Sequence, residues 1–179
     1  MAQKLIVEGN DAIALAKLCQ LRGLKPPVGY ESPEKFRHEF VASGGGYEKT
    51  LRLLRLAINQ ADLSNIGIIV DADMAGAHAR WQAIRNVLSE KYSAQTLVQT
   101  DQQQGAKVLQ ESDLPTIGVW IMPDNAGTGY LEHFLAGLVP VGEELWPHAN
   151  QALDKLFDQK FNEIPKAKSG KARLHTWLA

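Results

Sequence analysis

Cysteine is nearly absent from this sequence of 179 residues, which contains one, Cys19. A single cysteine excludes an internal disulfide framework and a zinc site built from several thiolates. A strong excess of one charge is also lacking, because 19 basic and 20 acidic residues leave a formal net charge of -1. This balance argues against a strongly basic nucleic-acid clamp, but it is compatible with local basic patches. We expect Cys19 to be a small buried side chain of a helix.

Long apolar runs are missing as well. No stretch approaches the roughly 18 apolar residues of a transmembrane helix, and the first residues do not resemble a secretory signal peptide. We therefore expect a cytoplasmic protein with no membrane partner. Hydrophobic residues make up 45% of the chain and charged residues 22%, a composition that supports a sizeable core and is typical of one ordinary folded domain.

Short apolar runs alternate with longer amphipathic segments. Leu5–Val7, Ile66–Val70 and Ile117–Met122 lack a regular polar alternation, which predicts strands covered on both faces, as in a parallel sheet. Helices are expected between and after these strands, over residues 12–21, 47–60, 75–91, 130–138, 143–161 and 172–178. The pattern predicts an α/β fold with a mainly parallel sheet flanked by helices on both faces.

Other segments carry weaker patterns. Short strands are expected within residues 28–31, 36–42 and 95–99, and a polar loop over residues 101–110. The Pro140-Val141-Gly142 segment separates two predicted helices. We therefore expect an α/β core over residues 1–140 and a helical C-terminal extension, residues 141–179, that packs on this core within a single domain.

Acidic residues directly follow the three apolar strands. Glu8 follows the first, Asp71 and Asp73 the second, and Asp124 the third. Ligands of open α/β sheets bind at the carboxyl ends of the strands, and alternation along an extended chain predicts that Asp71 and Asp73 point to the same side. Carboxylate oxygens suit Mg²⁺ or Mn²⁺, so we expect a divalent metal site centred on Asp71 and Asp73 and completed by Glu8. Glu8, close by, could act as a general acid or base.

Simpler interpretations compete with this one. Asp73 precedes a predicted helix and could cap it, and His78 or His133 is more often an ordinary core or surface residue than a ligand. Four basic residues could contact phosphates: Arg80, Arg85, Lys91 and Lys107. For Arg80 and Arg85, a solvated helix face is an equally good explanation. The basic residues of the segment 166–173 form a denser candidate for phosphate contacts, with an exposed linker as the alternative.

The acidic segments resemble the motifs of the Toprim domain, which is shared by topoisomerases, primases and the OLD-type (overcoming lysogenisation defect) nucleases. Leu5–Asp11 resembles the motif with a glutamate after the first strand, and Ile68–Asp73 resembles the later strand that ends in Asp-x-Asp. Gly44–Tyr47, Gly118–Asn125 and Gly129–Leu135 are similar to segments of a small, functionally uncharacterised Toprim-like family of bacterial proteins. The resemblance covers nearly the whole chain.

This resemblance implies that Asp71 and Asp73 bind Mg²⁺ and that Glu8, beside them, is the acid or base of phosphoryl transfer. It also implies Asp124 or Glu132 as a ligand of a second ion, and two ions about 3.5–4 Å apart stabilise the attacking and the leaving oxygen. The implied function is a Mg²⁺-dependent nuclease with DNA or RNA as its partner. The sequence lacks the Gly-x-x-x-x-Gly-Lys-Ser/Thr phosphate loop, so a separate ATPase subunit is left open, as is a homodimer.

Two further interpretations remain open. One is a non-catalytic Toprim-like module that binds nucleic acid or a protein. The other is a different metal enzyme, since Asp-x-Asp also holds the metal of nucleotide-sugar glycosyltransferases and occurs in haloacid-dehalogenase-type phosphatases. Those phosphatases carry the pair at the first strand with Thr or Val soon after it, whereas Met74 and Ala75 follow here. The glycosyltransferases are usually longer, and their chemistry does not explain Glu8.

Overall fold

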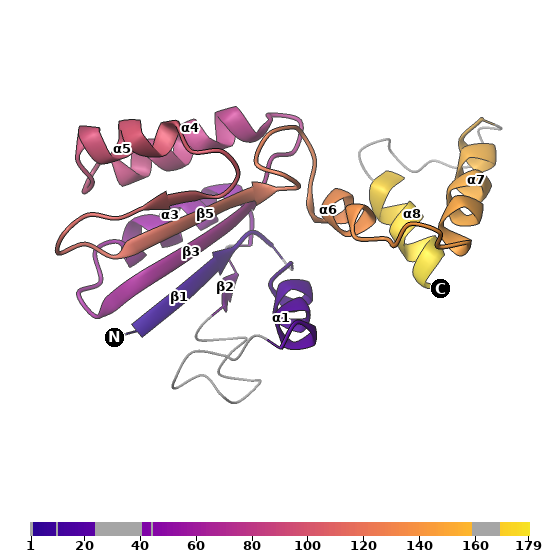
Figure 1. Ribbon diagram of the computed structural model, residues 1–179, viewed down its shortest axis with the longest axis horizontal. Helices are drawn as coiled ribbons and strands as arrows, with labels where there is room; N and C mark the ends of the chain where they lie inside the picture. The colour runs from indigo at the N-terminus through magenta and orange to yellow at the C-terminus, as the bar shows by residue number, and fades with distance from the viewer. Residues whose placement is uncertain (1, 10, 24–40, 44, 159–168) are drawn as a thin grey trace. The chain divides into compact units, whose positions relative to one another are not determined.

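The computed structural model describes residues 2–9, 11–23, 41–43, 45–158 and 169–179. By its contacts the chain forms two units, Met1–Gly129 and Tyr130–Ala179, which Figure 1 traces from indigo to yellow. The expected division at residue 140 and the packing of the C-terminal part on the core stay predictions. The strand expected at 28–31 and most of the one expected at 36–42 lie outside the described residues. No helix of the described ranges is long and apolar enough to cross a membrane.

A sheet of five described strands forms the centre of the first unit, in the order β2-β1-β3-β5-β4. The strands are β1 Ala2–Val7, β2 Val41–Ser43, β3 Leu63–Asp71, β4 Lys107–Leu109 and β5 Thr116–Met122. β1 pairs in parallel with β2 and β3, and β3 pairs in parallel with β5. β4 pairs antiparallel with β5 at the edge. The predicted α/β fold with a mainly parallel sheet is confirmed.

Helices cover both faces of this sheet. α1 (Asp11–Leu21) joins β1 to β2, α3 (Tyr47–Ala57) precedes β3, and α4 (Ala77–Leu88) follows β3. The step from β1 to β2 runs in one direction across the sheet, and the steps from β2 to β3 and from β3 to β5 run in the other. Because crossovers between parallel strands are right-handed, α1 lies on one face and α3 and α4 on the opposite one. Figure 1 shows α1 and α4 on opposite sides of the strands.

The main core lies between one face of the sheet and the helices α3 and α4. Ile6, Ile68 and Val119 are neighbours in register on adjacent strands and are at most 1% exposed. The helices contribute large buried side chains, among them Leu54, Trp81, Ile84 and Leu88. Burial of each such side chain contributes about 1.5–3 kcal/mol to the stability of the fold. The packed core therefore fixes the positions of the ends of β1, β3 and β5.

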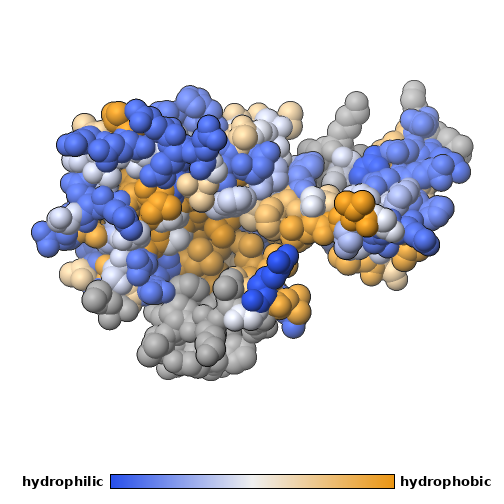
Figure 2. Space-filling model, in the orientation of Figure 1, coloured by the Kyte–Doolittle hydropathy of each residue, from blue (hydrophilic) through white to orange (hydrophobic). Residues whose placement is uncertain are grey.

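The opposite face of the sheet is less completely covered. Leu5, Ile69 and Trp120 lie on it and are only half-buried, and Figure 2 shows hydrophobic surface over the strands beside the hydrophilic helices α4 and α5. Gly67 pairs with Leu5 on this face, and a Cβ at Gly67 would lie 2.7 Å from Leu5 Cδ1. The glycine thus allows the leucine of the neighbouring strand to lie flat across it.

Three sequence-based expectations are wrong in this unit. Residues 95–99 are not a strand but part of helix α5, Ala94–Asp101. Ser93 caps this helix by accepting a hydrogen bond from Thr96 N–H at 3.2 Å, a start signal that outweighs the β-branched residues within it. The loop expected at 101–110 contains β4, which pairs antiparallel with β5, the next strand along the chain. Cys19 is partly exposed and not fully buried.

The second unit contains the helices α6 Leu131–Gly137, α7 Leu145–Asp158 and α8 Ser169–Leu178. The rings of Trp146 and Trp177 meet edge to face with centroids 5.7 Å apart. Glu143 accepts hydrogen bonds from the backbone N–H of Trp146 at 2.5 Å and from Trp177 Nε1 at 2.9 Å. Residues 169–171, expected in a basic linker, begin α8, and Arg173 pairs with Asp154 at 2.5 Å. Lys166 and Lys168 lie outside the described residues.

Candidate functional site

The carboxyl ends of β1 and β3 form a topological switch point. The two strands are neighbours, but the chain leaves β1 toward β2 on one side and leaves β3 toward β5 on the other. Diverging connections open a crevice at the strand ends, which is where open α/β sheets bind their ligands. Glu8 follows β1 and donates its backbone N–H to Ile69 O at 3.0 Å, while Asp71 ends β3. The structure thus places both residues at this switch point.

Glu8 and Asp71 are in direct contact. Glu8 Oε2 accepts a hydrogen bond from the backbone N–H of Asp71 at 3.3 Å. Burial raises the pKa of Glu8, the hydrogen bond from Asp71 opposes this rise, and the negative charge of Asp73 adds to it. A half-buried carboxyl with a raised pKa can exchange a proton closer to neutral pH, which is the property required of a general acid or base.

Asp73 lies where the chain leaves the sheet. Its backbone exchanges two hydrogen bonds with Gly129, from Asp73 N–H to Gly129 O at 2.7 Å and from Gly129 N–H to Asp73 O at 3.1 Å. Its φ of 48° is left-handed, a conformation that Asp tolerates better than most residues. The extended backbone therefore ends before Asp73, and the alternation that predicted Asp71 and Asp73 on the same side does not reach it. The side chain of Asp73 instead pairs with a residue of α4.

That partner is Arg80 of α4. Its Nη2 lies 2.7 Å from Asp73 Oδ2, and its Cζ lies 3.8 Å from the centre of the Tyr47 ring on α3. The Arg80 side chain is 16% exposed, so the interpretation of this residue as part of a solvated helix face is wrong. Sequence reasoning named Arg80 but missed both contacts, since Tyr47 lies 33 positions away and meets it only through the packing of α3 on α4.

Asp124 follows β5 but is engaged by its own loop. Its Oδ1 accepts hydrogen bonds from the backbone N–H groups of Ala126 and Gly127, both at 3.0 Å. The bond from Gly127 contributes most, ahead of that from Ala126, and together they lower the pKa of Asp124. Asp124 therefore stays ionised and orders the turn after β5. Glu132 lies in the first turn of α6, in the second unit. The roles of Asp124 and Glu132 as ligands of a second ion stay predictions.

The acidic residues have the right ligand atoms for a divalent ion, but their side chains do not converge on one point. Asp71, Asp73 and Glu8 offer the hard oxygens that Mg²⁺ takes. Within the described ranges, however, no three side chains of His, Cys, Asp or Glu converge in a group able to hold a metal. One carboxylate oxygen of Asp73 already contacts Arg80. An ion at Asp73 would therefore have to compete with the guanidinium.

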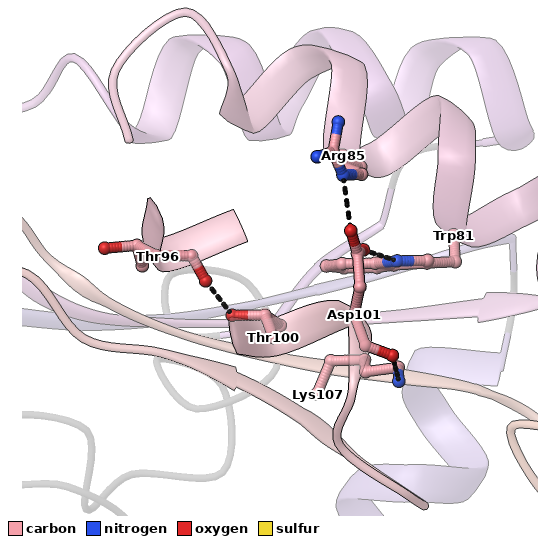
Figure 3. Close-up of polar contacts among 6 residues, drawn as sticks. All are labelled: Trp81, Arg85, Thr96, Thr100, Asp101 and Lys107. Carbon is pink, nitrogen blue, oxygen red and sulfur yellow. Dashed lines mark hydrogen bonds and ion pairs between the residues drawn. The ribbon is translucent and has the colours of Figure 1, made fainter. Parts of the chain in front are cut away.

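A second polar cluster joins α4, α5 and β4 (Figure 3). Asp101 accepts from Trp81 Nε1 at 2.7 Å and from Arg85 Nε at 3.1 Å. Lys107 Nζ donates to Asp101 O at 3.2 Å and lies 5.9 Å from the centre of the Trp81 ring. Arg85 and Lys107, which were candidates for phosphate contacts, thus have partners within the fold. The sequence offered one signal, the spacing of Trp81 and Arg85 by one helical turn.

A pocket of about 330 Å³ borders this cluster. Its lining includes His78 and Asn125, together with Trp81, Asp101 and Lys107. Asn125 Oδ1 accepts from Ile121 N–H at 2.7 Å, and its Nδ2 is buried with no hydrogen-bond partner among the residues that the structure describes. Sequence reasoning did not single out the side chain of Asn125 as a donor.

Comparison with known proteins places the chain in one family. No significant match was found among curated proteins, and none was found among solved structures. The model of the family described as "Protein of unknown function (DUF3226)" matches residues 2–179. Because the match spans nearly the entire sequence, the chain belongs to this family.

Proposed function

We propose that this chain is a Mg²⁺-dependent phosphoryl-transfer protein that acts as a nuclease on DNA or RNA. The observation that carries the proposal is the contact between Glu8 and Asp71 at the switch point, where a proton-exchanging carboxyl adjoins the start of the Asp71-Ala72-Asp73 segment. The resemblance of both segments to Toprim motifs supports the same chemistry. The proposal includes a cytoplasmic location, because nucleic acids are present there.

Each acid has a distinct role in this proposal. Asp71 and Asp73 hold the ion, and Mn²⁺ could replace Mg²⁺ because both prefer oxygen ligands. When bound, the ion supplies a positive charge that polarises the phosphoryl group. Glu8 exchanges the proton of the attacking or the leaving oxygen, since burial favours its protonated form and its carboxyl is fixed by the N–H of Asp71.

Calorimetric titration with Mn²⁺ tests the metal site. The double variant Asp71→Asn/Asp73→Asn keeps the size of the side chains and removes their charge, and we expect it to abolish Mn²⁺ binding. The matched control is Asp62→Asn/Asp113→Asn, because these exposed acids border the opposite ends of β3 and β5 and Asp113 shares the left-handed backbone of Asp73. Equal Mn²⁺ affinity in the parent and the Asp71/Asp73 variant would rule out this site.

Incubation with plasmid, linear DNA and RNA in Mg²⁺ or Mn²⁺ tests the reaction. We expect cleavage by the parent and a loss of about 10²–10⁴-fold in Glu8→Gln, the usual contribution of a general acid or base. The Asp62→Asn/Asp113→Asn control should cleave like the parent. Cleavage that persists unchanged in Glu8→Gln would remove this residue from the mechanism.

A second candidate function is a module that binds nucleic acid without cleaving it. The pairing of Asp73 with Arg80 favours it, because a carboxylate already neutralised by a guanidinium has less need of a cation. Binding of a labelled oligonucleotide that does not change on addition of Mn²⁺, together with no cleavage of any substrate, would support this candidate over the nuclease.

A further inference from the structure

The guanidinium of Arg80 is fixed beside the acids of the switch point by two elements of the first unit. Arg80 lies in the first turn of α4, and its Nη2 contacts Asp73 at 2.7 Å. The ring of Tyr47 on α3 lies 3.8 Å beneath its Cζ, and the Tyr47 hydroxyl reaches the carbonyl oxygen of Arg80 at 3.5 Å. Stacking and the ion pair together hold the cation in one orientation beside Asp73.

The contacts of this guanidinium leave a strong donor unused. Arg80 Nε is buried and has no hydrogen-bond partner among the residues that the structure describes. The contact with Asp73 runs through Nη2 only, although a carboxylate can engage an arginine through two parallel hydrogen bonds. A buried donor without an acceptor costs free energy, so an oxyanion that reaches both Nε and an Nη would improve the environment of this side chain.

Arg80 lies beside the acids of the proposed metal site, because its Nη2 contacts Asp73 Oδ2 at 2.7 Å. A cation beside the metal ion further reduces the repulsion between a nucleic-acid phosphate and these acids. Arginine suits this role because its planar fork fits two phosphate oxygens.

We propose that Arg80 is the phosphate-binding residue of this site: Asp73 exchanges it for the divalent ion, and its guanidinium, still stacked on Tyr47, binds a phosphate of a nucleic-acid strand through Nε and an Nη. This inference rests on the proposed function and names the group that recognises its substrate. No covalent bond changes in this step, since one ion pair, Arg80 with Asp73, is replaced by another, Arg80 with phosphate.

The test compares Arg80→Met and Arg80→Lys with Arg85→Met, a matched control one turn further along α4 whose partner is Asp101. The probes are a fluorescein-labelled single-stranded DNA, followed by anisotropy, and adenosine monophosphate, followed by calorimetry, each with Mn²⁺ and with EDTA. We expect Arg80→Met to weaken binding of the DNA about tenfold or more, the effect of one charge-assisted hydrogen bond. Arg80→Lys should recover part of it as a point charge, and Arg85→Met should bind like the parent.

Each result bears on the inference. A loss confined to adenosine monophosphate supports phosphate binding by Arg80 and identifies a free nucleotide as its source. Unchanged binding of both probes in Arg80→Met overturns the inference, as does a parent that binds neither. If Arg80→Met does not fold by circular dichroism, Arg80→Lys decides, because a lysine cannot form the fork and should still bind the DNA less tightly than the parent.

Titration with Mn²⁺ separates this inference from the proposed function. We expect Arg80→Met to bind Mn²⁺ at least as tightly as the parent, since Asp73 no longer shares its charge with the guanidinium. Weaker Mn²⁺ binding in this variant would overturn the exchange at Asp73. If the parent binds no Mn²⁺, the metal-dependent function fails, while the DNA comparison in EDTA still decides whether Arg80 binds phosphate.

Discussion

Glu8 Oε2 accepts a hydrogen bond from the backbone N–H of Asp71 across 3.3 Å, although 63 positions separate the two residues. The contact exists because β1 and β3 are adjacent parallel strands in register, with Val7 opposite Ile69. It connects the residue after β1 to the last residue of β3. The side chain of Glu8 therefore has a defined place at the switch point before any ligand binds, which lowers the entropy lost on binding.

The first prediction concerns the pH dependence that Glu8 confers on stability. Folding raises its pKa above the ordinary value of 4.5, chiefly by burial, so its contribution favours the folded state below that value and is lost as the pH rises through the folded pKa. We expect Glu8→Gln to be more stable than the parent at pH 7, with the advantage shrinking as the pH falls toward 4.5. Thermal unfolding between pH 4 and 8 measures this, and a difference independent of pH would contradict it.

The second prediction concerns the ion pair of Asp73 and Arg80. The Asp73 side chain is 47% exposed, so we expect a coupling energy of about 0.5–1 kcal/mol, near the upper end for exposed pairs. Urea unfolding of Asp73→Asn, Arg80→Met and the double variant gives this coupling directly. The pair Arg55–Glu90, with exposures of 50% and 43% at 2.8 Å, is the control and should give less. A larger coupling energy for Arg55–Glu90 than for Asp73–Arg80 would show that stacking on Tyr47 does not strengthen the ion pair of Arg80.

The third prediction concerns Asp124. Its carboxylate accepts two backbone N–H groups of its own loop, so we expect Asp124→Ala to lower the free energy of unfolding by about 1 kcal/mol, the usual net contribution of a hydrogen bond. Asp124→Asn, which keeps an acceptor oxygen, should lose less. Because the pKa of Asp124 is lowered from 3.8, the effect should be present above that value and fade as the pH falls through the folded pKa. Reduced Mn²⁺ stoichiometry in Asp124→Asn would favour its role in a second ion site.

The fourth prediction concerns the cluster around Asp101. Trp81 is 5% exposed and its Nε1 donates to the Asp101 carboxylate at 2.7 Å. Trp81→Phe keeps a ring in the core but removes this donor, and we expect it to cost about 2 kcal/mol, the range for a hydrogen bond to a charged group. Arg85→Met removes the more exposed partner and should cost under about 1 kcal/mol. Urea denaturation measures both, and equal losses would mean that burial does not govern the two bonds.

The fifth prediction concerns the second unit. Glu143 accepts from Leu145 N–H at 3.1 Å, from Trp146 N–H at 2.5 Å and from Trp177 Nε1 at 2.9 Å. We expect Glu143→Ala to destabilise this unit by about 1–2 kcal/mol, since it removes the cap of α7 and its negative charge at the helix start. Tryptophan fluorescence reports on Trp146 and Trp177 during unfolding. Trp177→Phe loses only one of the three hydrogen bonds and should destabilise the unit less than Glu143→Ala. A larger loss in Trp177→Phe would mean that the contact between the Trp146 and Trp177 rings, and not Glu143, governs the stability of this unit.

The local pattern of the chain was sufficient for the strands that carry the site and for most helices. Ile66–Val70 is apolar at every position because both faces of β3 are covered to some degree, and Glu8, Asp71 and Asp124 follow strands that such runs identify. α5 and β4 escaped this kind of prediction. The helix depends on one capping serine, and the strand consists of three residues whose stability comes from pairing with β5.

By itself, then, the sequence determined the α/β class, the apolar strands and the acids at their ends, because periodicity and composition are local properties. Only the tertiary structure decided which acids meet. The order of the strands brought Glu8 to Asp71, the left-handed turn took Asp73 out of the alternation, and the packing of α3 on α4 set Arg80 between Asp73 and Tyr47. These relationships depend on contacts between residues far apart in the chain, and local patterns do not encode them.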